Sequence, residues 1–530
     1  MSQTELFSLF ALLCPGSFVI VALCSFYQPG QRPSMVKTGS IIAAWLNIIV
    51  AIVACMLVGR YGLLQSPLAG FQQFGFSLRL DALSVTMLTM IALLSFIIVK
   101  FSLNYLDGDE RQGAFLGRLC ATIAAVQLLV VAGNLGLLIA AWAVTSLQLH
   151  RLLVFYRNRP GAIIAARKKF IVARLAEVCL VLAAILLFRQ FGTGNLELIF
   201  TGLKNLPEGH WNITVEVAAG LVALAAILKS AQFPAYGWLI EVMETPTPVS
   251  ALLHAGVLNA GPFLIIRMAF LMEQATIAPV LLLVAGSFTA LFASVAYTTQ
   301  PSVKVALGYS SAAHMGFSLM VCGMGSYGAA MLHIMAHSFY KAHAFLSSGS
   351  VVEVARAGKI TIQERLGNPW RILAAFLIAA AIFSGLAFAW GISPSTDFSL
   401  LAIGAIVVLG VTQLIATALD SAKPWYATLR AGAMALGVIT AFFTLEAMIR
   451  ITLQSQITTL AAPQAHIMWL VAGIILIYAL VILLQIVSPF LAKNKWTYAL
   501  WVHFRHGLYA NAWFDKLTGA LRQRATILNN

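Results

Sequence analysis

The pattern of hydrophobic positions along the chain is dominated by apolar runs of about 20 residues, the length that a helix needs to cross the hydrocarbon core of a membrane. Inside lipid, each backbone amide must be hydrogen-bonded within the chain, so helices are the expected elements. We therefore predict an all-α, polytopic integral membrane protein of about 14–15 transmembrane helices. Their centres are expected near residues 16, 48, 91, 125, 145, 180, 222, 258, 288, 314, 338, 381, 409, 441 and 477.

The composition agrees with a chain that is solvated by lipid. Hydrophobic residues make up 60% of the sequence and charged residues 10%, and the mean hydropathy is +0.89. A soluble domain has about 25% charged residues. The first apolar run, which starts at Leu6, has no basic segment before it and is predicted to be a retained helix rather than a cleaved signal. All 6 cysteines lie in apolar runs without a CxxC pair, which indicates inert thiols.

The distribution of basic residues predicts the topology. With the N-terminus outside and the C-terminus in the cytoplasm, 24 of the 33 Lys and Arg residues lie at the inner face, as the positive-inside rule requires. The segment 151–169 is the most basic. The net charge of +15 is therefore interpreted as topology and contact with anionic lipid, not as nucleic-acid binding. The outer basic residues are Arg60, Arg79, Arg189, Lys204, Arg267 and Arg450.

A lysine and a proline interrupt one of the apolar runs. Lys229 ends the run VAAGLVALAAIL, and Pro234 follows five residues later. A proline inside a helix removes a hydrogen bond and clashes with the preceding turn, so the helix is expected to break beside the ammonium group. Broken helices at membrane depth are typical of proteins that handle ions. The alternative is a lysine whose side chain reaches up to the membrane interface.

A short acidic and proline-rich segment follows. Glu241 and Glu244 precede the segment Thr245 to Pro248, whose prolines are expected to start a new helix. Ser250 and His254 are four residues apart, so they lie on one face of that helix. An imidazole exchanges protons near neutral pH, which makes His254 a candidate for proton transfer. A buried structural histidine is the alternative.

A second group of ionisable residues has a regular spacing. His333, His337 and Lys341 are separated by four residues each, which places them on one stripe of a helix over about 12 Å. Water between them would allow a proton to pass, whereas contact with a neighbouring helix is the alternative. Lys304 and His314, on the preceding helix, are candidates for the same line. The third residue on the stripe is a lysine, a poor zinc ligand, so no metal site is predicted.

Other charged residues lie within apolar runs. Arg174 and Glu177 are three residues apart and are expected to pair. Asp81 stands at the start of a run. For Glu446 and His466, a structural role is at least as well supported as a functional one. No Walker loop, dinucleotide fingerprint or HExxH motif is present, so the energy source is expected to be an ion gradient or a partner.

These motifs resemble a known family. KSAQFP, METPTPVSALLHAG and FLIIR, followed by SVKVALGYSSAAHMGF and HIMAHSFYKAHAFLSSGSVV, are similar to the core segments of the antiporter-like subunits of respiratory complex I and of Mrp-type sodium/proton antiporters. FSLRLDALS and GLYANAWFDKL fit the subunit-five branch. The resemblance implies two inverted repeats of five helices, each with a broken helix at mid-membrane. The implied divisions are 1–115 (N-terminal helices), 116–270 (first repeat), 277–419 (second repeat) and 420–530 (C-terminal helices and basic tail).

The resemblance also implies roles for individual residues. Lys229 matches the lysine of the first channel, and His254 matches the bridging histidine. Arg174 and Glu177 occupy the neighbourhood of the family's charged pair on the sixth helix. The residues that match the central hydrophilic axis are Lys304, His333, His337 and Lys341.

The chain departs from the family pattern at two switch positions. The family's fifth helix carries a glutamate in a GWE triplet, and Ala143 stands there in this chain. His150, two turns further on, is a candidate substitute. The family's twelfth helix carries a lysine, whereas the corresponding segment AIFSGLAFAWGISPSTDFSL holds only Asp397 as a charge. The long lateral helix of complex I is also not expected, since 20 residues follow Ala510.

These departures and the ending HFRHGLYANAWFDKL resemble the DabB-like membrane subunits of the DAB inorganic-carbon accumulation systems. The resemblance implies a bacterial inner membrane location and a large peripheral, cytoplasmic, DabA-like partner with a zinc-containing, carbonic-anhydrase-like site. This chain would then be no enzyme and hold no cofactor, but would conduct H⁺ or Na⁺ to drive hydration of CO₂ to bicarbonate. Three alternatives remain open: a cation/proton antiporter subunit of an Mrp-like assembly, a complex I-like subunit, and a membrane anchor without transport.

Overall fold

The computed structural model describes residues 3–71, 74–156, 159–206, 212–349, 369–393, 397–419, 424–457, 465–491 and 495–519. Every predicted centre lies inside a helix, so the all-α membrane class is confirmed. Within the described residues, 13 helices are long and apolar enough to cross a membrane. Two further helices fall outside that group because α9 has only 17 residues and α16 carries the polar stripe.

The N-terminal helices form one side of the bundle and expose apolar side chains such as Phe26 and Trp45, as a lipid-facing surface requires. Two small antiparallel β pairs, β1 with β4 and β2 with β3, connect α3 to α4. The elements are α1 (Gln3–Leu9), η1 (Phe10–Leu12), α2 (Leu13–Tyr27), α3 (Ser34–Tyr61), β1 (Leu64–Gln65), β2 (Ala69–Phe71), β3 (Phe74–Phe76), β4 (Arg79–Leu80) and α4 (Ala82–Tyr105).

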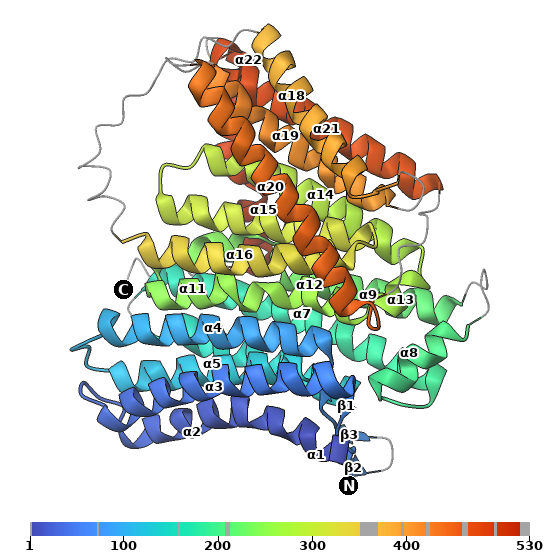
Figure 1. The fold of residues 1–530 in the computed structure, drawn as a ribbon. Helices are drawn as coiled ribbons and strands as arrows, with labels where there is room; N and C mark the ends of the chain where they lie inside the picture. The colour runs from blue at the N-terminus through green and yellow to red at the C-terminus, as the bar shows by residue number, and fades with distance from the viewer. Residues whose placement is uncertain are drawn as a thin grey trace.

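The central helices lie side by side in the middle of the molecule (Figure 1). Two of them are interrupted, between α9 and α10 and again between α11 and α12. The elements are α5 (Gln112–Val130), α6 (Leu135–Leu153), α7 (Pro160–Phe191), α8 (Leu196–Lys204), α9 (Ile213–Lys229), α10 (Gly237–Glu241), η2 (Val242–Glu244), α11 (Thr247–Ala255), η3 (Val257–Asn259), α12 (Ala260–Arg267), α13 (Ala269–Glu273), α14 (Ile277–Thr298), α15 (Val303–Gly323) and α16 (Tyr327–Ser347).

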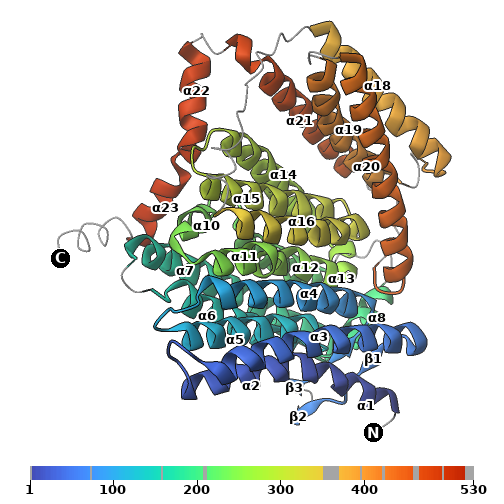
Figure 2. The same cartoon turned by 60° about the vertical axis from the view of Figure 1, so that its left-hand side comes forward.

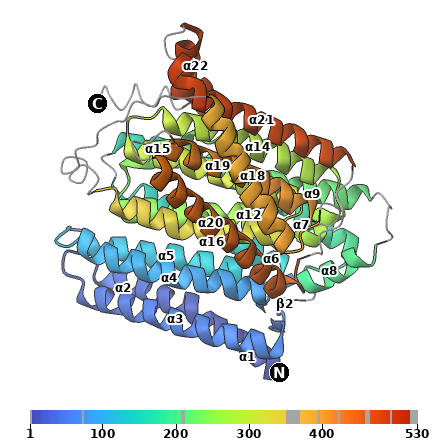
Figure 3. The same cartoon turned by 45° about the horizontal axis from the view of Figure 1, so that its top comes forward.

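The C-terminal helices lie across α14, α15 and α16 (Figure 3). Three of them, α18, α19 and α20, share a small apolar core of their own, which includes Phe383, Ile415 and Phe443. α22 and α23 then pass along the ends of the central helices and reach α10 (Figure 2). The elements are α18 (Pro369–Ala389), α19 (Phe398–Leu419), α20 (Pro424–Leu453), α21 (Ala465–Leu491), α22 (Lys495–Arg505), η4 (Gly507–Tyr509) and α23 (Ala510–Thr518).

α18, which lies in the segment expected to hold the second repeat, is continuous from Pro369 to Ala389. The physical reason is its sequence, which is apolar and has no proline after its first residue. Pro394, the nearest later proline, lies outside the described residues.

Candidate ion pathway

The interruption after Lys229 is confirmed. α9 ends at Lys229, and a helical conformation resumes only at Gly237, where α10 begins. Pro234 lies inside this break, as its missing amide hydrogen predicts. Ala231, also in the break, has a φ of 52°, a conformation that costs energy for a residue with a side chain. The backbone is therefore irregular next to the buried ammonium group.

Lys229 is 6% exposed and has defined partners. Its Nζ donates a hydrogen bond of 2.8 Å to the Ser146 hydroxyl and lies 4.5 Å from the centre of the Trp142 ring. A lysine at the bilayer centre costs about 2.5–3.5 kcal/mol. A hydrogen bond from a charged group offsets about 1.5–3 kcal/mol, and the aromatic face adds about 0.5–2 kcal/mol. The Lys229 Nζ is therefore held in place by defined contacts inside the bundle.

A second lysine, Lys169, contacts Ser146 as well. Its Nζ donates to the Ser146 carbonyl at 2.6 Å, and its side chain is buried. The sequence interpretation missed Lys169 because it placed the residue in a basic loop. In the structure, α7 begins at Pro160, so Lys169 lies in the third turn of a helix. A proline at the first helical position was the available signal.

The predicted pair of Arg174 and Glu177 is confirmed, with 2.6 Å between Nη2 and Oε1. The Glu177 carboxylate also interacts electrostatically with Lys229 and Lys169. Glu177 of α7 thus supplies a carboxylate near Lys229 and Lys169. His150 instead lies against Phe170, with ring centres 5.3 Å apart.

Glu241 and Glu244 hold α7 and the C-terminal segment. Glu241 accepts hydrogen bonds from Lys168 at 2.6 Å and from Asn511 of α23 at 3.0 Å. Lys168 is fully buried and also pairs with Asp515. Glu244 accepts from the backbone amide of Ala162, in the first turn of α7, at 3.2 Å. Both glutamates therefore anchor helices on the side of the bundle where α23 lies.

α11 begins at Thr247 with Pro248 in its first turn, as predicted. The Ser250 hydroxyl lies 3.3 Å from that of Thr245, which fixes the start of the helix. His254, one turn later, is 0% exposed and stacks on Phe345 of α16 with ring centres 4.2 Å apart. Neither of its ring nitrogens has a hydrogen-bond partner in the described part of the chain. The imidazole is placed between the two halves of the bundle with both nitrogens available.

The stripe on α16 is confirmed as a cluster. His333 Nε2 lies 3.2 Å from His314 Nδ1 of α15, a distance at which a proton can pass directly. His337 follows, with its ring centre 5.0 Å from that of His314 and no hydrogen-bond partner within the described residues. Lys341, which is 0% exposed, donates to the Leu307 carbonyl at 3.2 Å. Electrostatic interactions join Lys341 to His337 and to His254.

A cavity of about 700 Å³ adjoins this cluster. It lies between α14, α15 and α16 on one side and α19, α20 and α21 on the other. His314 and His333 line it, together with hydroxyl groups of Ser294, Ser310 and Tyr478. The Tyr478 hydroxyl has no partner among the described residues. Most of its lining is apolar, and the two imidazoles and these hydroxyl groups are polar positions in its wall.

Lys304 lies in the first turn of α15, where its Nζ is 3.5 Å from the Thr247 hydroxyl. No hydrogen bond connects Lys229 with His254 in the described residues, and the space between their helices is only about 10 Å³.

A buried ion network that the sequence interpretation missed ties α4 to α12. Asp81 caps α4 by accepting from the Ser84 amide at 2.8 Å, and it pairs with Arg79 at 2.6 Å and Arg267 at 2.5 Å. Burial alone would raise the pKa of Asp81, but the two guanidinium groups hold that pKa below its usual range. Arg79 and Arg267 are therefore structural ions rather than surface charges.

Glu446 has a structural partner as well. It lies 3.9 Å from Arg450, which also contacts Asp397 at 3.2 Å. Among the described residues, no group of three His, Cys, Asp or Glu side chains is arranged to hold a metal ion.

Comparisons with known proteins agree with this geometry. Residues 132–419 match the family model described as "NADH:quinone oxidoreductase/Mrp antiporter, TM", and residues 68–116 match "NADH-Ubiquinone oxidoreductase (complex I), chain 5 N-terminus". A relative from Halothiobacillus neapolitanus, named "Probable inorganic carbon transporter subunit DabB2", is 36% identical over 456 residues, which are 85% of this chain and 81% of the relative.

A second relative and a solved structure extend the comparison. "Probable inorganic carbon transporter subunit DabB" of Hydrogenovibrio crunogenus is 42% identical over 51% of this chain, which spans 52% of that relative. The Mrp complex from Dietzia sp. DQ12-45-1b shares the fold, with a TM-score of 0.59 and 21% identity over 98% of this chain and 59% of that chain. The chain belongs to the NADH:quinone oxidoreductase/Mrp antiporter family and is an antiporter-like membrane subunit whose relatives are named as inorganic carbon transporter subunits.

Proposed function

We propose that this chain conducts protons, or sodium ions, through the membrane and couples their flow to hydration of CO₂ by a peripheral zinc-containing partner subunit. The names of its relatives support inorganic carbon as the cargo of the assembly. In the proposal, this chain supplies the ion path, and the carbon chemistry takes place in a DabA-like partner at the cytoplasmic face of a bacterial inner membrane.

The observation that carries the proposal is the line of basic groups from His254 through Lys341 and His337 to the pair His314 and His333. Buried polar groups in proteins are normally hydrogen-bonded. Here two imidazoles, those of His254 and His337, have all their ring nitrogens unpaired within the described residues. Groups that must bind and release a proton cannot be held permanently in one hydrogen-bonded state. In the proposal, water reaches this line through the adjoining cavity of about 700 Å³.

The energy released when one ion crosses the membrane is sufficient to accumulate bicarbonate. An elementary charge that crosses 100 mV releases about 2.3 kcal/mol. A tenfold concentration difference costs about 1.4 kcal/mol. One ion per CO₂ molecule would therefore sustain a bicarbonate gradient of some tens-fold.

The test uses cells that depend on this assembly for growth in air. Lys341→Ala should abolish growth in air, restore it under added CO₂, and leave the amount of assembled complex unchanged. His343→Ala is the matched control, since His343 lies on the same helix but is exposed. Normal growth of the Lys341→Ala strain in air would remove the proposal and favour a membrane anchor without transport.

A cation/proton antiporter subunit of an Mrp-like assembly is the second candidate, favoured by the shared fold and by the buried set of Lys229, Glu177 and Arg174. That function predicts sodium sensitivity rather than a CO₂ requirement when the gene is deleted. Growth of the deletion strain on graded NaCl, in air and in added CO₂, separates the two. A complex I-like role would instead predict a change in NADH-dependent respiration of the same strain.

A further inference from the structure

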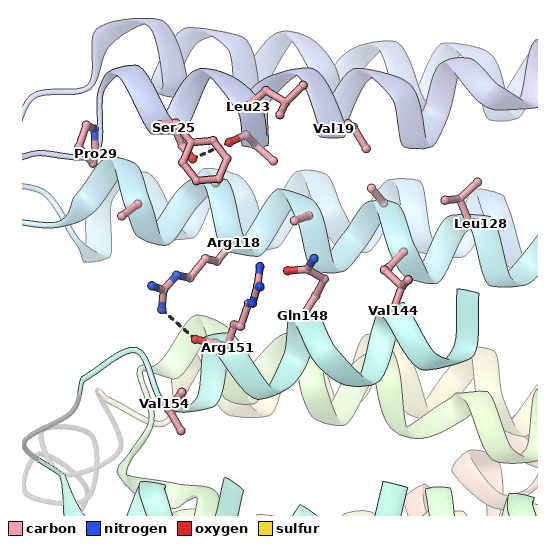
Figure 4. Close-up of a pocket in the computed structure, with 17 residues that line it drawn as sticks. Val19, Leu23, Ser25, Pro29, Arg118, Leu128, Val144, Gln148, Arg151 and Val154 are labelled. Carbon is pink, nitrogen blue, oxygen red and sulfur yellow. Dashed lines mark hydrogen bonds between the residues drawn. The ribbon is translucent and has the colours of Figure 1, made fainter. Parts of the chain in front are cut away.

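A groove on the surface of the first helices is separate from both lysine sites. It lies between α2, α5 and α6 and has a volume of about 720 Å³ (Figure 4). Apolar side chains form its walls, among them Leu23, which is 56% exposed, and Val144, which is 40% exposed. The middle of its floor is made by Ala121 and Ala125 of α5. A contiguous apolar surface of this kind marks an interaction site.

Small residues explain why the groove is there. A side chain at Gly117 would overlap the Ser25 side chain, so α5 and α2 approach closely at that point. The Ser25 hydroxyl donates to the Ala22 carbonyl at 2.6 Å and therefore stays against its own helix. On the other side of α5, the alanine side chains are too short to fill the space toward α6. The groove therefore extends close to the backbone of α5 at these alanines.

One end of the groove is basic. Arg118 and Arg151 lie there, and Figure 4 shows both side chains, with Gln148, directed into the same space. The Arg118 guanidinium donates to the Arg151 carbonyl at 2.9 Å, which holds it at the last turn of α6. The Arg151 guanidinium has no hydrogen-bond or ion-pair partner within the described residues, and no Asp or Glu lines the groove. Two guanidinium groups therefore lie at one end of a groove that no acidic side chain lines.

The combination selects one class of ligand. Arginine binds phosphate oxygens in a bidentate manner, and an anion between the two guanidinium groups would remove their mutual repulsion. A free phosphate ion would leave the apolar part of the groove exposed. A helix of a partner subunit would need an acidic residue positioned to pair with Arg118 and Arg151. We propose that the groove binds one anionic phospholipid, with its phosphate at Arg118 and Arg151 and an acyl chain along Ala121 and Ala125.

Retention of lipid by the purified assembly tests the proposal. The assembly is stripped of lipid and loaded with phosphatidylglycerol or phosphatidylcholine of identical chains, and bound lipid is counted by native mass spectrometry. The double variant Arg118→Gln/Arg151→Gln should lose about fivefold of phosphatidylglycerol retention per arginine. Ala121→Phe, which narrows the channel without a change of charge, should lower retention of the same lipid. Arg167→Gln is the matched control, because Arg167 is an exposed arginine of α7 outside the groove.

Three results would overturn the proposal. The double variant could retain phosphatidylglycerol as the unaltered chain does, or phosphatidylcholine could be retained equally well. Glycerol 3-phosphate could displace phosphatidylglycerol at equal concentration, which would reduce the site to an anion site. A photo-crosslinker at Leu23 could capture a partner subunit instead of lipid in the intact assembly. Thermal melting of each variant shows whether it is folded. If the arginine double variant does not fold, lipid retention by Ala121→Phe still tests the proposal.

Discussion

Lys229 and Lys341 are both buried lysines, and they differ in how much room their surroundings leave for water. Lys229 has a hydroxyl, an aromatic face and a nearby carboxylate, and the space beside it is about 10 Å³. Lys341 has one carbonyl as its hydrogen-bond acceptor, and the histidines next to it reach a cavity of about 700 Å³. The first lysine is held by several fixed contacts, whereas the second has one hydrogen-bond acceptor and lies beside histidines that border a cavity.

The largest expected effect separates the two lysines directly. Lys341→Met should lower ion flux about 100-fold or more, the usual contribution of a positioned proton-transfer group. Lys229→Met should lower ion flux about tenfold, because the Lys169 side chain still donates a hydrogen bond to Ser146. Flux is measured with a pH-sensitive dye in vesicles that contain the assembly.

The double variant Lys169→Met/Lys229→Met is the control for that explanation. If Lys169 substitutes for Lys229, the double variant should be as inactive as Lys341→Met. A double variant no worse than Lys229→Met alone would show that Lys169 has no part in the first site.

A smaller effect is expected from filling the cavity. Ala336 lines it on α16, and Ala336→Phe should displace water beside His333 and reduce flux about tenfold. Assembly and thermal stability should remain unchanged. Val303→Phe serves as the control, because Val303 is exposed on α15 away from the cavity. Equal flux in both variants would contradict a water-filled route to the histidines.

A weaker effect is expected at the first lysine when its hydroxyl partner is removed. Ser146→Ala deletes the hydrogen bond to Lys229 but keeps the backbone carbonyl that holds Lys169. The loss of one charged hydrogen bond is worth about 1.5–3 kcal/mol before relaxation. We expect a flux between that of the unaltered chain and that of Lys229→Met. Ser146→Thr, which keeps the hydroxyl, should restore most of it.

The smallest expected effect concerns the fold between pH 7 and pH 5. The pKa of Asp81 is held below its usual range by Arg267 and Arg79. Its stabilising contribution is therefore complete above the ordinary aspartate value of about 3.9 and is lost only as the pH falls further. Thermal unfolding should be unchanged across this interval. Loss of flux in the same interval would then not come from unfolding. A lower melting temperature at pH 5 would contradict this.

The sequence predicted the membrane helices well because each depends on a local property, a run of apolar residues. It also predicted the break at Pro234 and the stripe on α16, since proline chemistry and helical spacing are local too. The position of Lys169 was missed because a charged segment was taken for a loop although Pro160 starts a helix there. The Glu177 carboxylate could not be assigned to Lys229, nor Asp81 to Arg267, because those contacts join segments that are far apart in the chain.

The docking of α23 has a consequence for the order of synthesis. Lys168 and Glu241 enter the bundle with α7 and α10, but Asn511 and Asp515 are translated after all the membrane helices. A side chain at Gly237 would overlap Asn511, so α10 and α23 are fitted to each other at close range. Until α23 has emerged from the ribosome, the Lys168 ammonium has Glu241 as its sole acidic contact among these residues. A nascent chain therefore completes the contacts of Lys168 last, after all the candidate spans have been translated.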